Sequence, residues 1–474
     1  MIELILALIV ICAVLCFFDL RVGMCLTLAA GFLQDPVRKL VPDAPVIYSA
    51  LVVLFAALTF IGAKLSGAIR PLSAIPDWKS RLELPIVLFV VLVLFQSIAA
   101  YSYTGSVFLA GIGLLVYLSP FPALLLGYSF ASNADRVYAF LWLYVVLCAA
   151  MVSGVYLSWL GVDWEILQSV GDPLVVYSLE SGEPLELPSG FLRAPEVAAW
   201  HAASGACIVL MLGLFKGRKD TGLLSVALAL FFIGAVMLSG RRKFLLEIAM
   251  FLPVLWWLLW RFRLATGRIL YLLFFLAVAG AVVMATGLVE SNTREAFQAP
   301  VVRGQDRVDE IIERIENVTI GAIPYILETN GFLGSGAGSG SGGAQYFGGG
   351  DDRVGLAAEG GLGKILAEIG VPGVLLFFWL SFRFSVYVWR TLSLASKGDP
   401  AVAQVTMGIA AFLASNAAVF TNAHQVYSDP FILLLMGYCL GFILATHRYP
   451  EHGRLSDELL IRQGSRNRQR SIYS

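Results

Sequence analysis

The sequence predicts an all-α, polytopic integral membrane protein with about 12–14 transmembrane helices. Two observations lead to this fold class. The chain is 58% hydrophobic and 14% charged, which is more apolar surface than a soluble domain can bury. Its apolar residues also gather in repeated runs of about 17–25 residues, the length at which a helix crosses the hydrocarbon core of a bilayer.

The apolar runs can be placed in chain order. The first run follows no basic segment and ends in no small-residue cleavage site, so we interpret it as a retained span. The second run is short and is expected to be tilted, re-entrant or longer than its apolar centre. The predicted spans lie near 2–18, 22–33, 45–66, 84–101, 106–130, 137–160, 195–215, 221–240, 244–260, 269–288, 363–387, 402–420 and 430–446.

These spans and their connections divide the chain into six parts. The parts are N-terminal transmembrane helices (1–160), an outer loop (161–194), transmembrane helices with a cationic hairpin (195–288), a long outer loop (289–362), C-terminal transmembrane helices (363–446) and a basic cytoplasmic tail (447–474).

The positions of lysine and arginine predict the orientation, because short cytoplasmic connections carry an excess of these residues. The tail carries six arginines between 448 and 470, so we expect the C-terminus in the cytoplasm and the N-terminus outside. Alternate connections agree with this assignment: they hold Arg383, Arg390 and Lys397; Arg261, Arg263 and Arg268; Lys216, Arg218 and Lys219; and Arg70, Lys79 and Arg81.

Two long connections fall on the outer side. The first, 161–194, is acidic until it reaches Arg193. The second, 289–362, contains Val308, Ile311, Ile312 and Ile315, whose spacing predicts an amphipathic helix. A glycine-rich stretch at 331–350 follows, and it is expected to be either a mobile loop over a substrate path or a flexible link.

Four cations lie on this outer side, where the charge rule disfavours them. Arg193 precedes the span at 195–215, and Arg241, Arg242 and Lys243 form the hairpin between the next two spans. They either reach lipid phosphates at the membrane surface or bind an anion presented in the outer leaflet. The planar guanidinium binds phosphate oxygens in pairs, so a cluster of arginines suits a diphosphate.

Several other ionisable residues are candidates for chemistry. Glu359 precedes the span at 363–387 and is a candidate catalytic carboxylate, whereas Glu368 lies inside that span and should face a cavity or a partner. Glu247 is expected to pair with a neighbouring cation. His201 and His424 have no companion at metal-ligand spacing, and neither have the six cysteines, so no metal or cofactor is predicted.

Three segments, in this order, resemble one family. They are Ser189-Gly-Phe-Leu-Arg-Ala-Pro-Glu before a span, Leu238-Ser-Gly-Arg-Arg-Lys in the hairpin, and Gly331-Phe-Leu-Gly-Ser-Gly followed by Leu366-Ala-Glu-Ile-Gly. Together they are similar to the O-antigen ligase and O-antigen polymerase superfamily of polysaccharide polymerases. The matching core covers about 189–385, and the first half of the chain matches in hydropathy alone.

The resemblance implies a GT-C-like fold and a location in the cytoplasmic (inner) membrane of a bacterium. It also implies transfer of a glycan from a polyprenyl diphosphate, such as undecaprenyl diphosphate, without nucleotide or metal. Arg193, Arg241, Arg242, Lys243 and Arg307 would bind the diphosphate. The remaining candidates for the acceptor or donor site are Glu196, His201 and His424. The implied partners are the lipid-linked oligosaccharide, the bilayer, a chain-length regulator and a flippase, with no nucleic acid.

One departure from the family pattern favours a polymerase over a ligase. Ligases of this kind carry a His-Asn pair at the position that Glu359 and Gly360 occupy here. The leading hypothesis is therefore polymerisation of lipid-linked repeat units of a surface polysaccharide in the cell envelope, an O-antigen or exopolysaccharide. A ligase-like transfer to another acceptor is the first alternative. A transporter or flippase is the second, and it would need a polar path through Gln96, Glu247, Glu368 and Asn416.

Overall fold

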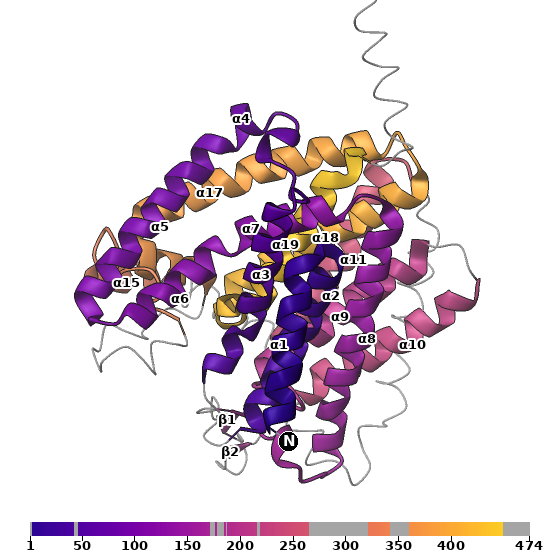
Figure 1. Ribbon diagram of the computed structural model, residues 1–474, viewed down its shortest axis with the longest axis horizontal. Helices are drawn as coiled ribbons and strands as arrows, with labels where there is room; N and C mark the ends of the chain where they lie inside the picture. The colour runs from indigo at the N-terminus through magenta and orange to yellow at the C-terminus, as the bar shows by residue number, and fades with distance from the viewer. Residues whose placement is uncertain are drawn as a thin grey trace, which may run out of the picture.

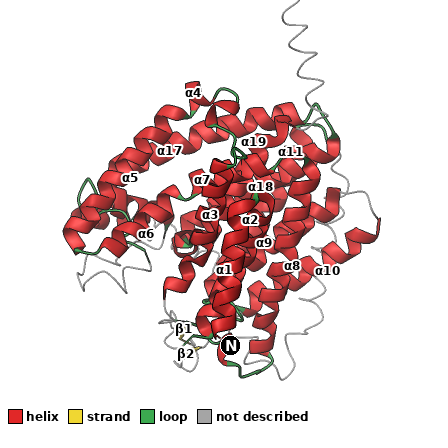
Figure 2. Ribbon diagram, viewed as in Figure 1, coloured by secondary structure: helices red, strands yellow, loops and turns green. Residues whose placement is uncertain are grey.

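The computed structural model describes residues 2–41, 46–170, 176–177, 184–185, 187–215, 219–264, 321–341 and 360–448. Helices dominate these ranges (Figures 1 and 2). The N-terminal part contains α1 (Ile2–Phe18), α2 (Leu20–Lys39), η1 (Val46–Ala50), α3 (Leu51–Leu65), η2 (Leu72–Ala74), α4 (Trp78–Arg81), α5 (Glu83–Thr104), α6 (Val107–Leu118), α7 (Pro120–Phe130) and α8 (Ala134–Trp159).

The remaining elements carry the segments singled out above. They are η3 (Glu165–Leu167), β1 (Val176–Tyr177), β2 (Pro184–Leu185), α9 (Pro195–Phe215), α10 (Lys219–Leu238), η4 (Arg242–Phe244), α11 (Leu245–Arg261), α15 (Ala322–Asn330), α17 (Gly361–Ala395), α18 (Pro400–Asn422), η6 (His424–Ser428), α19 (Pro430–Ala445) and η7 (Thr446–Arg448). The two short strands pair antiparallel, with Val176 opposite Leu185.

Seven of the described helices are long and apolar enough to cross a membrane, and α6 with α7 makes an eighth if this pair, bent by 40°, is one span. This result fits a multi-pass helical membrane protein. The predicted span at 269–288 lies outside the described residues, and each of the other predicted spans coincides with a helix or with the bent pair. The higher total of 12–14 spans stays a prediction.

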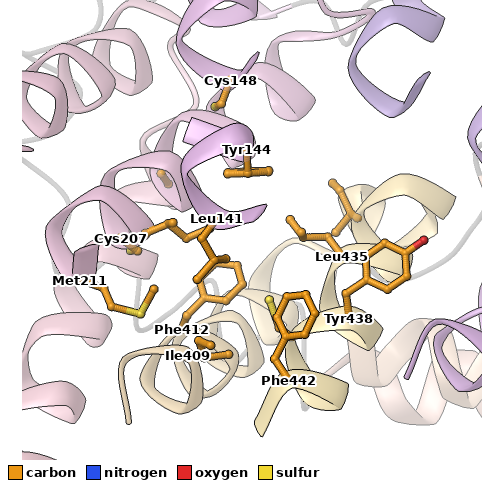
Figure 3. Close-up of a cluster of buried hydrophobic side chains, with 14 of the residues drawn as sticks. Leu141, Tyr144, Cys148, Cys207, Met211, Ile409, Phe412, Leu435, Tyr438 and Phe442 are labelled. Atoms are coloured by element: carbon orange, nitrogen blue, oxygen red, sulfur yellow. The ribbon is translucent and has the colours of Figure 1, made fainter. Parts of the chain in front are cut away.

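The packing separates a core from a lipid-facing surface. Within the apolar part of α9, 94% of the residues are buried, so this helix forms the centre of the bundle. Side chains from α8, α9, α18 and α19 meet in the hydrophobic core, including Leu141, Met211, Phe412 and Phe442 (Figure 3). By contrast, one side of α5 is exposed, as expected of a face in contact with lipid tails. The exposed fraction is between 50% and 66% for each of Leu84, Val87, Val91, Phe95 and Ile98.

Two predicted spans differ from the observed helices. The short run at 22–33 belongs to a helix of 20 residues, which Asp19 caps through the backbone N–H groups of Arg21 and Val22. Its last turns are polar but buried. The span at 363–387 belongs to α17, whose backbone leaves the helical conformation at Gly370 (φ 67°, ψ −171°).

The connections sort to the two ends of the bundle as the charge pattern predicts. The N-terminus and β1–β2, both expected outside, lie at one end of the molecule, whereas α4, expected in the cytoplasm, lies at the other (Figure 1). The alternation of the spans therefore agrees with the structure. Which end faces the cytoplasm stays a prediction.

Candidate functional site

Arg193 lies at the centre of a buried charged group at the end of the bundle that is predicted to be outer. Its Nη2 contacts Asp429 Oδ2 at 2.8 Å, and its Nη1 lies 3.7 Å from Asp35 Oδ1. Its backbone N–H also donates to Asp35 Oδ2 at 3.0 Å. Burial alone lowers the pKa of Arg193, but the charges of Asp429 and Asp35 more than offset it, so the guanidinium stays charged. Its side chain is 21% exposed.

The turn before α9 determines where Arg193 lies. Gly190 has a positive φ of 61°, and a Cβ there would lie 2.5 Å from the backbone nitrogen of Val155, so only glycine fits against α8. Lys39 Nζ donates to the carbonyl oxygens of Gly190 (2.8 Å) and Leu192 (2.7 Å) and fixes the turn from α2.

Arg241 forms a second ion pair beside the same helix. Its Nη2 contacts Glu196 Oε1 at 2.7 Å, and the two side chains are 14% and 11% exposed. Glu196 lies in the first turn of α9. In the described part of the chain, the buried Nε of Arg241 has no hydrogen-bond partner. The structure therefore places Arg193, Glu196 and Arg241 around the N-terminus of α9, with a carboxylate against each guanidinium.

The other predicted site residues fall into two groups. Arg307 and Glu359 lie outside the described residues, and so do the side chains of Arg242 and His424. Lys243 is described, and its Nζ lies over the ring of Phe244 at 5.8 Å from the centroid.

His201 is fully buried in the core of the bundle. Its Nδ1 shares a hydrogen bond of 3.0 Å with Tyr144 Oη, and its ring packs against Phe32, Trp200 and Phe431. This environment fits a packed polar residue and gives a glycan no access to the imidazole.

The expectation that Glu247 pairs with a cation is wrong. Glu247 is fully buried, and its Oε1 accepts from Ser204 Oγ (2.9 Å) and Asn416 Nδ2 (3.1 Å). Lys243 precedes it by four residues, but residues 242–244 form the 3₁₀ turn η4 outside α11. The helical spacing that would bring the two side chains together is therefore absent.

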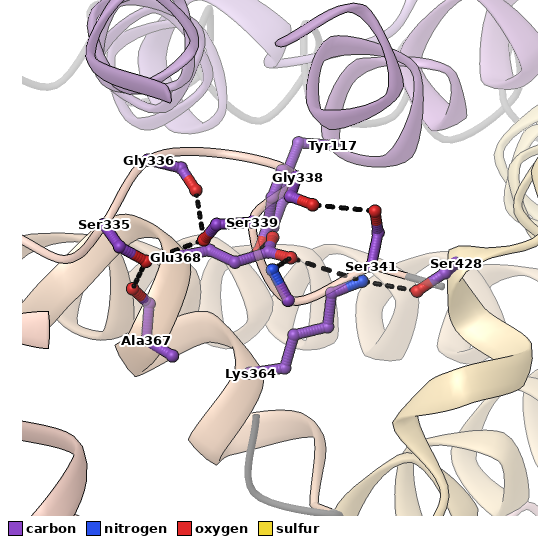
Figure 4. Close-up of polar contacts among 11 residues, drawn as sticks. Tyr117, Ser335, Gly336, Gly338, Ser339, Ser341, Lys364, Ala367, Glu368 and Ser428 are labelled. Carbon is purple, nitrogen blue, oxygen red and sulfur yellow. Dashed lines mark hydrogen bonds and ion pairs between the residues drawn. The ribbon is translucent and has the colours of Figure 1, made fainter. Parts of the chain in front are cut away.

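The glycine-rich stretch is neither a mobile loop nor a flexible link over its described half, 331–341. The backbone N–H groups of Ser335, Gly336 and Ala337 donate to Ala367 O, Glu368 O and Gln96 O at 2.8, 3.0 and 3.1 Å (Figure 4 shows this region). The remaining predicted half, 342–350, lies outside the described residues.

The acceptors for this loop come from the break in α17. The carbonyl of Glu368 would normally accept from residue 372, but that residue is Pro372, which has no N–H. The N–H of Val371 donates instead to Phe332 O at 3.0 Å. The loop therefore supplies hydrogen bonds that the helix lacks.

Glu368 joins the loop to the transmembrane helices, in agreement with the expectation that it faces a partner. Its Oε2 accepts from Tyr117 Oη at 2.6 Å, and its Oε1 accepts from the backbone N–H of Gly340 at 3.0 Å (Figure 4). Lys364 Nζ lies 3.8 Å from the same Oε1 and donates to Ser428 Oγ.

Sequence reasoning missed the partners of the cations. Asp35, Lys364, Ser428 and Asp429 each contact a charged group, and Lys39 fixes the turn before α9, yet none of them is among the site residues predicted from the sequence. Two features of the sequence point weakly to these residues. The run at 22–33 is followed by polar residues, and Asp429 precedes Pro430, a pattern typical of a helix N-cap. Asp429 is indeed such a cap, because its Oδ1 accepts from the N–H of Phe431 at 2.8 Å.

Within the described ranges, no three His, Cys, Asp or Glu side chains gather as a metal site requires. A scan against protein-family models and a search of curated proteins both found no match to this chain. The candidate site therefore rests on its own geometry.

Proposed function

We propose that the protein is a membrane glycosyltransferase that joins oligosaccharide repeat units carried on a polyprenyl diphosphate, at the outer face of the cytoplasmic membrane. The observation that carries this proposal is the pair of fixed guanidinium groups, Arg193 and Arg241, beside the N-terminus of α9. The unsatisfied N–H groups and the dipole at a helix N-terminus favour a bound anion, and guanidinium groups add charge and donors.

The arginines suit the leaving group of this reaction. An acceptor hydroxyl attacks the anomeric carbon, the bond from that carbon to the diphosphate oxygen breaks, and the diphosphate leaves with the electron pair. Fixed donors stabilise this growing charge without having to reorganise. The carboxylates that hold Arg193 and Arg241 would compete with a phosphate for the same N–H groups, so binding exchanges one set of oxygens for another.

The acceptor hydroxyl must also lose its proton. Glu359 is the candidate base in this proposal, and it immediately precedes Gly360, the N-cap residue of α17. Glu368 is a poor candidate, because Tyr117, Lys364 and the N–H of Gly340 already occupy its oxygens.

The test is an assay with purified protein in liposomes and a polyprenyl-diphosphate-linked oligosaccharide. Products are separated by size for the wild type, Arg193→Ala and Arg241→Ala, with the exposed Arg390→Ala as the matched control. We expect a ladder of longer glycans from the wild type and the control. We expect each site variant to lose about 100-fold in rate, the effect of deleting one transition-state donor. Normal ladders from both site variants would refute the proposal.

Two alternatives make different predictions. A ligase with the same diphosphate site would attach a glycan to a separate acceptor without producing a ladder. A transporter is the alternative of another class, and the buried Glu247–Asn416 pair is the observation that favours it. Gln96 and Glu368, in contrast, both hold the 331–341 loop. Repeat units trapped on the inner leaflet of a strain lacking the protein would support transport.

A further inference from the structure

Three consecutive residues between α18 and α19 each contact a different buried polar group. Tyr427 Oη donates to Asn416 at its Oδ1 (2.8 Å), and Asn416 in turn contacts Glu247. Ser428 Oγ accepts from Lys364 Nζ. Asp429 Oδ2 contacts Arg193 at 2.8 Å. One short segment therefore connects the core of the bundle, α17 and the Arg193 site.

The local backbone explains how neighbours reach three different partners. Residues 424–428 form the 3₁₀ turn η6. This helix type has about three residues per turn, so the side chains of Tyr427 and Ser428 leave it about 120° apart. Asp429 follows the turn with an extended backbone (φ −80°, ψ 118°). The turn packs against α9, α17, α18 and α19. Side chains that diverge from such a position meet different helices.

The segment also resists displacement. Asp429 is almost fully buried and caps α19 with its other carboxylate oxygen. Tyr427 donates both to the side chain and to the backbone carbonyl of Asn416, at 2.8 and 2.9 Å. Lys364 is 4% exposed and is fixed between Ser428 and Glu368. A shift of the segment would disturb all of these contacts together.

We propose that the Tyr427–Ser428–Asp429 segment positions Arg193 for a polyprenyl diphosphate, and that Ser428 is the residue that fixes the segment to α17. Ser428 acts through Asp429 and does not touch Arg193. This inference rests on the proposed function, because it takes Arg193 to be a diphosphate-binding residue. It adds a positioning role for Lys364 and Ser428, which the sequence motifs do not indicate.

The experiment measures binding of farnesyl diphosphate, a short polyprenyl diphosphate, to the full-length protein in detergent by isothermal titration calorimetry. The variants are Ser428→Ala, Ser428→Thr, Arg193→Gln and the double variant Arg193→Gln with Ser428→Ala. The control is Ser396→Ala, because within the described residues that hydroxyl donates to Ser393 O alone. It lies at the opposite end of α17 from Lys364. Thermal unfolding is recorded for each protein.

We expect Ser428→Ala to raise the Kd about three- to tenfold, which corresponds to the net contribution of one typical hydrogen bond. Ser428→Thr retains the hydroxyl and should restore binding. In the Arg193→Gln background, Ser428→Ala should have no further effect, because the residue that it positions is already gone. A purely structural role would lower the unfolding temperature without this dependence on Arg193.

The outcomes separate this inference from the proposed function. If Arg193→Gln weakens binding but Ser428→Ala does not, the diphosphate site stands and the positioning role is wrong. Equal losses from Ser428→Ala with and without Arg193 would also overturn the positioning role. No binding by the folded wild type would refute the diphosphate site itself. If Ser428→Ala fails to fold, Lys364→Arg tests the same dependence on Arg193, because it retains the charge but alters the contact with Ser428.

Discussion

At the scale of single residues, Asn416 connects more buried polar groups than its sequence context indicates. Its side chain accepts from Trp200 Nε1 at 2.8 Å and from Tyr427 Oη, and it donates to Glu247 Oε1 at 3.1 Å. All four residues are buried, so none of these groups can turn to water. A buried polar group that loses its partner costs about 1–3 kcal/mol.

Asn416→Leu should therefore destabilise the folded protein by about 3 kcal/mol, because it leaves the indole N–H and the Glu247 carboxyl short of partners. Thermal unfolding in detergent measures the loss. The matched control is the neighbouring buried Ser415→Ala, since that hydroxyl bonds only to Phe412 O within its own helix. Equal unfolding temperatures for Asn416→Leu and the control would contradict this assignment.

Single residues also account for the polar C-terminal end of α2. Gln34, Asp35, Arg38 and Lys39 are between 1% and 6% exposed, although they are residues that normally end an apolar span. Asp35 and Lys39 reach the turn before α9. The buried side chains of Asp35 and Lys39 therefore find their hydrogen-bond partners in the turn before α9.

At the scale of elements, the 331–341 loop and the break in α17 form one unit. The loop is held by backbone hydrogen bonds to α17 and to Gln96 of α5. Close approach depends on small residues: Gly338 has a φ of 97°, and a Cβ there would lie 2.4 Å from Leu109 O of α6. The glycines of the 331–341 loop therefore allow close packing against neighbouring helices, although glycine-rich sequence is typical of a flexible link.

We expect Gly338→Ala to destabilise the protein by at least about 3 kcal/mol, because it adds a steric clash to a disfavoured φ. The control is Gly105→Ala at the end of α5, where φ is also positive (67°) but a Cβ meets nothing within 4 Å. That change should cost about 1 kcal/mol. Chemical or thermal unfolding of both variants makes the comparison, and equal losses would show that the loop tolerates displacement.

At the scale of the whole molecule, the arrangement of the spans puts the charged groups together. Arg193, Arg241 and Asp429 come from connections far apart in the sequence, and each is predicted to lie on the outer side. Their contacts agree with that shared side. The end of α5 near Tyr103 is expected to face the same side, and the turn after α17 near Lys397 the opposite side.

Labelling of intact cells tests this orientation. In a background without native cysteines, Tyr103→Cys should react with a membrane-impermeant maleimide, because Tyr103 is 63% exposed at the predicted outer end of α5. Lys397→Cys, in the exposed turn after α17, should react only after lysis. The reverse pattern would invert the topology and place the arginine site in the cytoplasm, where the proposed reaction does not occur.

The sequence by itself determined that the chain is a multi-pass helical membrane protein, because span length and hydropathy are local properties that a bilayer constrains strongly. It also predicts that Arg193 and Arg241 lie on the same side of the membrane. Local patterns could not show which residues neutralise these cations. Asp35, Glu196 and Asp429 become partners only when the end of α2, the turn between α10 and α11 and the start of α19 come together at the N-terminus of α9.

Only the tertiary structure decided the roles of Glu247, Glu368 and the glycine-rich loop. Glu247 turns to Asn416 instead of a cation, because η4 interrupts the helical spacing to Lys243. The loop is fixed because Pro372 leaves the carbonyl of Glu368 without its usual helical partner. Contacts between residues distant in the sequence determine these outcomes, and they depend on packing that no single segment encodes.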